Sequence, residues 1–308
     1  MKKTIYFILG LISMNIFSCN EDKEVGIPIE IIEDYKLPQG NASVEANARI
    51  QEIYETYDSY VLYNYTQKDA LWKQAAGTGA VQKYVISMGD VQYVDAMLNY
   101  IDAIWLQFFP PEFLKKGGLP YRVFLADSIY LDRSTPQMTR LILYNYMLNG
   151  NSVAISGMNA NLTTMNAETK RARKLELITA MWDYYIAEGI LDIPEEFYDG
   201  TDYNTAPELP LTEKTLDTYR KRGFLPSRYY GDNYAEEWYV YPSSWKYAVT
   251  NDLKSFLYHL FSRSDEQMEI YLNNSEYKLI QNKWNVLINY YKEKYNIDIR
   301  KIGNTTYE

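Results

Sequence analysis

The side chains that most often perform enzymatic chemistry are scarce in this sequence of 308 residues. It contains one histidine, His259, and one cysteine, Cys19. A catalytic zinc site normally uses three protein ligands drawn largely from these two residue types, so the composition argues against zinc. A serine or cysteine hydrolase would need His259 as its base, yet this residue lies in a helical pattern where a structural histidine is more common. We predict no catalytic residue, no metal ligand and no bound cofactor.

Carboxylate chemistry stays open, because the chain has 40 acidic residues. Glycoside hydrolysis needs only two carboxyl groups at a suitable separation. Glu236 and Glu237 lie beside Trp238, whose ring could stack on a sugar, but the sequence places no second carboxylate opposite them. Residues 199–204 offer oxygen ligands for calcium, although their spacing is not that of an EF-hand loop, and we interpret them as a solvated turn. The sequence favours a protein without enzymatic activity and keeps a carboxylate-based glycan hydrolase as an alternative.

Aromatic residues are unusually frequent, with 32 tyrosines and 6 tryptophans. Most such side chains pack in or near a protein core, and the same side chains also line grooves that bind sugars or peptides. They are concentrated between residues 229 and 245. We predict that part of this segment forms an exposed stacking surface. The candidate ligand-binding residues are Tyr229, Tyr230, Tyr234, Trp238 and Trp245.

Hydrophobic periodicity predicts the elements that must position these residues. The clearest helix runs from Asp90 to Phe108, where apolar residues recur every three or four positions until Pro110 and Pro111 end the pattern. Short apolar runs predict buried strands at 60–65, 123–125, 141–144 and 152–156. Further helices are predicted at 43–57, 167–188, 212–221, 252–262 and 276–295, with a long loop over 192–210. This pattern predicts an α+β domain in which helices surround a small central sheet.

The N-terminus has the features of an export signal. Lys2 and Lys3 precede an apolar stretch over residues 5–17, and Ser18 is a small residue before Cys19. The pattern resembles a bacterial lipobox, in which the cysteine becomes the first mature residue and receives acyl chains such as palmitate. We predict a signal peptide over residues 1–18, a lipidated tether over 19–43 and a single domain over 44–308.

Charge limits the partners that the mature protein is expected to bind. The chain has a formal net charge of −9, which disfavours nucleic acid and anionic lipid surfaces. No later apolar run reaches the length of a membrane span, so we expect membrane contact only through the lipid on Cys19. The acidic segment 20–24 resembles the surface-export signal of Bacteroidota lipoproteins. This resemblance implies an outer-membrane location facing the cell exterior, whereas the alternative interpretation is a merely solvated tether.

Three motifs of the C-terminal third occur in a characteristic order. Gly223-Phe224 lies in a loop, Asn251-Asp252-Leu253 opens a helix, and Lys294-Tyr295-Asn296-Ile297-Asp298-Ile299 follows the last long helix. Together they resemble the zinc-binding metallopeptidase lipoproteins of Bacteroidota. The order of elements in the rest of the mature chain fits as well, and the match is specific over residues 223–300. The resemblance implies a metallopeptidase-like fold.

The residues with which that family would bind zinc are missing. Its defining feature is a His-Glu-x-x-His helix, followed by a further histidine, in which two histidines one turn apart bind the metal and the glutamate acts as base. In the corresponding helix Glu176 matches the glutamate. The ligand positions are occupied by Leu175, Thr179 and Trp182. The resemblance therefore implies the fold without the metal.

These observations lead to one favoured hypothesis and two alternatives. We expect a surface-exposed outer-membrane lipoprotein with a metallopeptidase-like fold and no catalytic activity, which binds a glycan, a peptide or an outer-membrane protein. The alternatives are the carboxylate-based glycan hydrolase and a structural accessory subunit of a nutrient-uptake complex.

Overall fold

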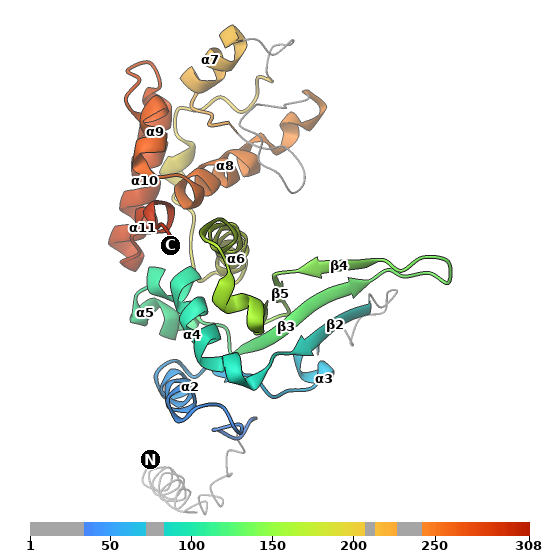
Figure 1. Cartoon of the computed structure of the whole chain (residues 1–308). Coiled ribbons are helices and arrows are strands. Elements are labelled where there is room, and N and C mark those ends of the chain that lie inside the picture. Colours follow the sequence, from blue (N-terminus) through green and yellow to red (C-terminus); the bar gives the residue numbers. More distant parts are fainter. Residues whose placement is uncertain (1–33, 72–82, 207–212, 227–241) are drawn as a thin grey trace, which may run out of the picture. The chain divides into compact units, whose positions relative to one another are not determined.

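One long strand, β3 (Arg122–Asp132), organises the sheet (Figure 1). Parallel strands flank its first half, and antiparallel strands flank its second half. The parallel neighbours are β1 (Tyr60–Leu62) and β6 (Ser152–Ser156), and the antiparallel neighbours are β2 (Lys83–Met88) and β4 (Leu141–Tyr144). A short strand, β5 (Tyr146–Leu148), pairs with the outer edge of β6. The result is a small sheet, as the sequence predicts, and its strand pairs are both parallel and antiparallel.

The computed structural model describes residues 34–71, 83–206, 213–226 and 242–308. Contacts divide the chain into two units, Met1–Lys36 and Leu37–Glu308, and the fold described below is that of the second unit. The predicted signal peptide and most of the predicted tether lie outside the described residues, so those boundaries stay predictions. In the described part of the chain, no helix combines the length and the apolar character that a membrane crossing requires.

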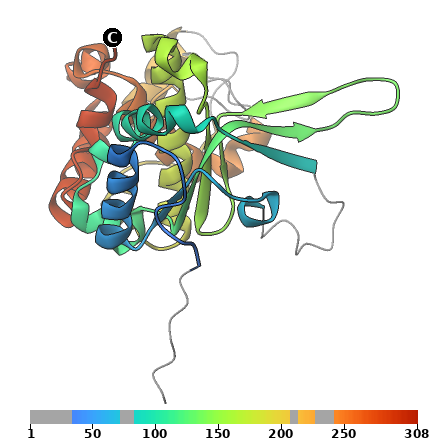
Figure 2. The same cartoon turned by 60° about the horizontal axis from the view of Figure 1, so that its bottom comes forward.

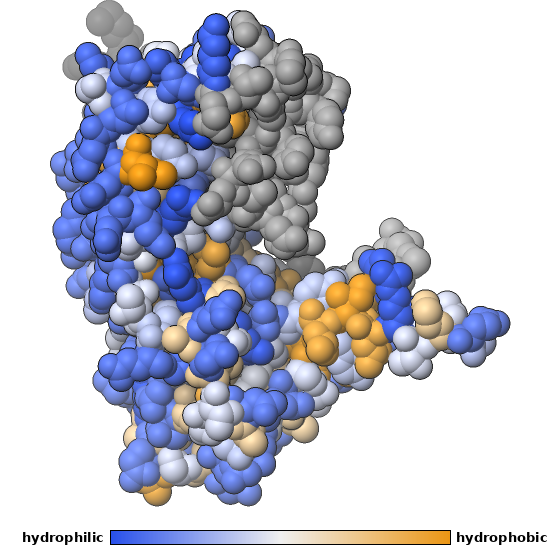
Figure 3. Space-filling view, turned by 45° about the horizontal axis from the view of Figure 1, so that its top comes forward, coloured by the Kyte–Doolittle hydropathy of each residue, from blue (hydrophilic) through white to orange (hydrophobic). Residues whose placement is uncertain are grey.

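The two halves of β3 lie in different surroundings. Val123, Phe124 and Leu125 are buried, as is every residue of the neighbouring β6. The second half continues with β4 as an arm that extends beyond the helices (Figure 2). On β4 the side chain of Leu143 is 74% exposed, and apolar residues gather on the surface of this arm (Figure 3). The core of the domain therefore lies around the first half of β3.

Helices pack against one another around a core rich in aromatic residues. The helix α6 (Ala167–Ala187) contacts α4 (Val94–Ile104) on one side and α8 (Ala248–Ser262) on another. Where α4 ends, the indole Nε1 of Trp105 donates a hydrogen bond to the hydroxyl of Tyr185 at 3.1 Å, and that hydroxyl donates to the carbonyl of Gly118 at 2.7 Å. These two buried polar groups are therefore satisfied, whereas the buried indole Nε1 of Trp182 on α6 has no hydrogen-bond partner among the described residues.

Local signals in the sequence explain where most helices begin and end. The hydroxyl of Ser43 caps the first helix, α2 (Val44–Tyr57). Asp90 caps the segment predicted as the next helix. In the structure this segment consists of a 3-10 turn at Val91–Tyr93, the helix α4, and a second 3-10 turn at Leu106–Phe108. The predicted α+β architecture in a single domain is confirmed.

The remaining helices form the C-terminal part of the domain. Those predicted from the sequence are α7 (Glu213–Lys221), α8 and α10 (Lys278–Tyr295). The sequence analysis missed two short helices, α9 (Asp265–Leu272) and α11 (Ile299–Asn304), together with strands β2 and β5. Short elements also include α3 (Gln67–Ala70), α5 (Pro111–Phe113), the π-helical turn Leu114–Gly118, and 3-10 turns at Ala160–Thr164, Glu195–Tyr198 and Pro242–Tyr247.

Candidate functional site

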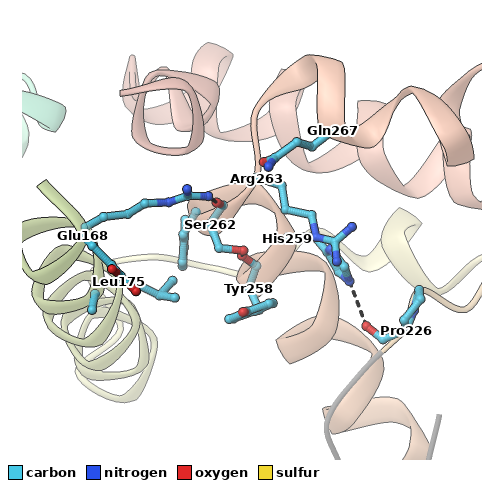
Figure 4. Close-up of a pocket in the computed structure, with 11 residues that line it drawn as sticks. Glu168, Leu175, Pro226, Tyr258, His259, Ser262, Arg263 and Gln267 are labelled. Carbon is cyan, nitrogen blue, oxygen red and sulfur yellow. Dashed lines mark hydrogen bonds between the residues drawn. The ribbon is translucent and has the colours of Figure 1, made fainter. Parts of the chain in front are cut away.

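A cavity of about 520 Å³ lies between α6 and the C-terminal end of α8 (Figure 4). Its α6 wall consists of residues three and four positions apart, which share one face of a helix. The opposite wall comes from the last turns of α8, the residue that follows it, and α9. The described lining residues are Glu168, Arg171, Ala172, Leu175, Pro226, Tyr258, His259, Phe261, Ser262, Arg263 and Gln267. A cavity of this size is typical of a site for a small molecule.

His259 lies in the wall of this cavity and is only 1% exposed. Burial, followed by the nearby positive charge of Arg263, lowers the pKa of its imidazole to about 3, so the ring is neutral at physiological pH. Its Nε2 lies 2.7 Å from the carbonyl oxygen of Pro226. A carbonyl only accepts, so Nε2 carries the proton and Nδ1 carries a lone pair. This buried Nδ1 has no hydrogen-bond partner among the described residues.

Two arginines satisfy the carbonyl groups at the C-terminal end of α8. Arg171 donates from Nη2 to the carbonyl of Ser262 at 2.6 Å. Arg300 donates to the carbonyls of Leu260 and Arg263, each at 2.8 Å, and pairs with Asp265 at 2.7 Å. The last carbonyls of a helix have no partner within the helix, and positive charge there is favourable. Arg171 thus reaches from α6 across the cavity edge to α8 and holds the two walls together.

The hydroxyl and imidazole groups of the cavity are not arranged for nucleophilic catalysis. The Oγ of Ser262 donates to the carbonyl of Tyr258 at 2.7 Å, and His259 donates to Pro226. Neither forms the hydroxyl–imidazole hydrogen bond that activates a serine. The guanidinium of Arg171 and the side-chain amide of Gln267 instead offer hydrogen-bond donors to a ligand. The arrangement suits the binding of a polar ligand.

The residues that match the zinc motif in register are dispersed. Leu175 lines the cavity, while Thr179 and Trp182 line a smaller one of about 70 Å³. Glu176 is exposed and accepts a hydrogen bond from Asn145 at 2.6 Å. Leu175 and Trp182 have no ligand atom suited to zinc, so these positions do not fit the metal. Across the described ranges there is no group of three or more His, Cys, Asp or Glu side chains that could hold an ion.

A second polar cluster lies at the other end of α8. Asp252 and Lys283 form an ion pair at 2.6 Å, with exposed side-chain fractions of 1% and 2%. The hydroxyl of Tyr203 donates to the same carboxylate oxygen at 2.6 Å, and the ammonium also donates to the carbonyl of Gly223 at 3.1 Å. The ammonium lies 5.1 to 5.5 Å from the ring centres of four aromatic residues, Phe197, Tyr203, Phe224 and Phe256.

Burial has opposite effects on the two members of this pair. Desolvation raises the pKa of the Asp252 carboxyl and lowers the pKa of the Lys283 ammonium, because removal from water disfavours both charged forms. Their mutual attraction opposes both shifts. The other carboxylate oxygen of Asp252 has no partner among the described residues. This cluster is closed to solvent, and we interpret it as a structural clamp between α8 and α10.

The predicted ligand-binding aromatics are described only in part. Tyr229, Tyr230, Tyr234 and Trp238 lie outside the described residues, as do Glu236, Glu237 and Cys19. Trp245 is 9% exposed, donates from Nε1 to the carbonyl of Tyr203 at 2.6 Å, and packs with Tyr219 and Phe224. The predicted stacking surface stays a prediction.

The loop considered for calcium contains a turn held by one aspartate. The carboxylate of Asp202 accepts hydrogen bonds from the backbone N–H groups of Asn204 and Thr205, at 2.8 and 3.3 Å. Hydrogen bonds from Thr205 and Asn204 lower the pKa of this exposed carboxyl. Aspartate side chains commonly stabilise turns in this way.

The sequence indicates one wall of the cavity but not the cavity itself. The spacing of Glu168, Arg171, Ala172 and Leu175 places these residues on one face of a predicted helix. The sequence does not show that this face lies opposite the end of α8, because Arg171 and its partner Ser262 are 91 residues apart.

Comparisons with known proteins give a distant likeness. No protein-family model matches the chain, and no curated protein matches it in sequence. Among solved structures, it is similar to a "putative zinc-binding metallo-peptidase" from Bacteroides caccae, with 10% sequence identity and a TM-score of 0.42. The match covers 85% of this chain and 91% of the other. At this identity and TM-score the comparison does not assign the chain to a family.

Proposed function

We propose that this chain is an exported, lipid-anchored protein of the outer-membrane surface that binds a ligand without catalysing a reaction. The single observation that carries the binding function is the cavity between α6 and α8. It combines a volume suited to a small molecule with converging polar groups, which is the usual composition of a ligand site. The ligand classes that fit are a glycan, a peptide or a segment of an outer-membrane partner.

Binding is tested by presenting glycan and peptide arrays to the mature protein and to two matched variants. Ala172 lies in the cavity wall, so Ala172→Trp should fill the cavity and remove binding. Ala187 is exposed at the far end of the same helix, so Ala187→Trp adds an equal ring away from the cavity and should leave binding unchanged. Array ligands that still bind the Ala172→Trp variant would show that the binding site lies elsewhere on the protein.

The absence of peptidase activity follows from the residues at the zinc-ligand positions. Without imidazoles to hold an ion, Glu176 has no acidified water to deprotonate. We expect metal analysis of the folded protein, after dialysis against trace zinc, to give far less than one zinc per chain. Nearly one zinc per chain, lost on substitution of His259 or Glu176, would restore the peptidase hypothesis.

The anchor follows from the N-terminal sequence, in which Cys19 is the predicted site of acylation. We expect Cys19→Ala to release the protein from membranes, since the acyl chains are the proposed membrane contact. The measurement is the fraction of protein in the membrane pellet after a high-salt wash. A Cys19→Ala protein that stays in the pellet would show that another segment holds it there.

A further inference from the structure

We infer that the cavity between α6 and α8 recognises a carboxylate on its ligand, an inference that rests on the proposed binding function. The first observation is the charge of the lining. Among its described lining residues are two arginines, Arg171 and Arg263, and one acid, Glu168. The described lining therefore has more cationic than anionic side chains, whereas the chain as a whole has a formal net charge of −9. Such a local excess of positive charge attracts an anion.

The second observation is that the charge of Arg171 lacks a counter-charge. Its one hydrogen bond in the described part of the chain goes to a neutral carbonyl, that of Ser262. A guanidinium has five N–H donors in a planar fork that matches a carboxylate. In contrast, Arg300, which caps the same helix end, is paired with Asp265. The equivalent anion for Arg171 is missing from the described residues.

A neighbouring lysine shows the same excess of positive charge. The ammonium of Lys174 is fully buried and donates to the carbonyl of Ile302. Burial and, to a smaller extent, the charges of Arg171 and Arg300 together lower the pKa of this ammonium to about 8. A carboxylate bound beside Arg171 would relieve this repulsion. The cation cluster therefore favours an anionic ligand on electrostatic grounds.

The third observation is the unpaired nitrogen of His259. Its buried Nδ1 accepts no hydrogen bond from the described residues, although buried acceptors are normally paired. His259 lies in the cavity wall with Arg263 beside it (Figure 4). A ligand whose carboxylate binds Arg171 could supply a hydroxyl or N–H donor to Nδ1 from the same side of the cavity. An acidic sugar and the C-terminal residue of a peptide both carry a carboxylate next to such donors.

The test compares small probes that differ in charge, by calorimetric titration of the mature protein in detergent. D-glucuronate and D-glucose form one pair, and dialanine and its amide form the other. We expect at least one carboxylate to bind, with an affinity about tenfold or more above that of its neutral counterpart. Binding of glucuronate identifies an acidic sugar as the source of the carboxylate, and binding of dialanine identifies a peptide terminus.

Two arginine variants separate recognition from general charge. Arg171→Gln should lower the affinity for the carboxylate probe about tenfold or more, because it removes the forked guanidinium that pairs with a carboxylate. Arg140→Gln removes the same charge from an exposed position on the β3–β4 arm and should leave the affinity unchanged. The inference is wrong if neither carboxylate binds, if neutral probes bind equally well, or if Arg171→Gln has no effect. If the arrays yield only neutral ligands, and Ala172→Trp abolishes their binding, the proposed binding function stands and this inference is wrong.

Discussion

The two ends of α8 use charge in opposite ways. At its N-terminal end, Asp252 is paired with Lys283 and enclosed by aromatic rings. At its C-terminal end, Arg171 and Arg263 line an open cavity, and Arg171 has only a carbonyl partner in the described residues. The first arrangement leaves no room for a ligand. The second leaves both the room and the unmatched charge.

This contrast separates polar groups with a structural role from polar groups that we propose bind a ligand, at the two ends of α8. A buried ion pair costs much desolvation energy, and its partners are needed mainly to avoid an uncompensated charge. A cation beside a cavity keeps part of its hydration until a ligand replaces it, so its charge stays available for the proposed binding even where, as for Arg171, one N–H also holds the fold. We therefore expect substitutions in the clamp to change stability and substitutions in the cavity to change affinity.

The largest effect is expected for Lys283→Met, which leaves Asp252 buried without its partner. We predict a loss of about 3–5 kcal/mol in the free energy of unfolding, measured by urea denaturation. The double variant Asp252→Asn/Lys283→Met should recover part of this loss, because it removes the second charge as well. Equal stability of Lys283→Met and the wild type would show that the pair does not clamp the fold.

A smaller loss is expected where α11 meets the end of α8. A Cβ on Gly303 would collide with the backbone carbonyl oxygens of Leu260 and Arg263. We predict that Gly303→Ala lowers the free energy of unfolding by about 1–3 kcal/mol, as overpacking of a core usually does. Because the same carbonyls are held by Arg300, a measurable loss of cavity affinity should accompany the destabilisation. Unchanged ligand affinity in Gly303→Ala would show that the packing of α11 against α8 does not influence the cavity.

Acidification tests the burial of His259. Its folded pKa of about 3 lies below the unfolded value of 6.5, so the unfolded chain binds the proton more readily. The associated stability is present above pH 6.5 and is lost as pH falls toward 3. Between pH 7 and pH 5 we predict a loss of about 2 kcal/mol that is absent in His259→Gln. If the free energy of unfolding changes with pH in the same way in the wild type and in His259→Gln, His259 is not buried in a neutral form.

The smallest effect is expected at an exposed ion pair near the middle of α8. Lys254 and Asp183 lie 3.6 Å apart, and both side chains are about half exposed. Such pairs contribute little because water and salt screen them. Lys254→Met should change the free energy of unfolding by less than about 1 kcal/mol. A loss as large as that of Lys283→Met would remove the distinction between buried and exposed pairs in this protein.

Local sequence patterns predicted the helices well because their signals are local. Ser43 and Asp90 cap the helices that follow them, and Gly189 has a positive φ of 68° just after α6, where the sequence predicts a stop. A similar signal was overlooked for α9, where Ser264 and Gln267 form a capping box. Strands β2 and β5 were missed because their hydrogen bonds are made with β3 and β6 rather than within the segment.

The candidate site was harder to predict because it is built from distant segments. The sequence suggested a structural role for His259, and the structure buries it, but its position beside α6 depends on helix packing. The clamp joins residues 31 positions apart on different helices. No periodicity distinguishes Lys283, which is buried in a pair, from the many exposed lysines of the chain. Only the fold shows which charges are matched.

The most direct test of the cavity as the binding site is an NMR titration of the Leu37–Glu308 unit with D-glucuronate and, separately, with dialanine. We predict that the largest amide shifts fall in residues 168–175 and 258–267, on the two walls of the cavity, while Tyr203 and Lys283 of the clamp stay unchanged. Shifts centred on the clamp or on the β3–β4 arm, or no shifts with either probe, would contradict the account.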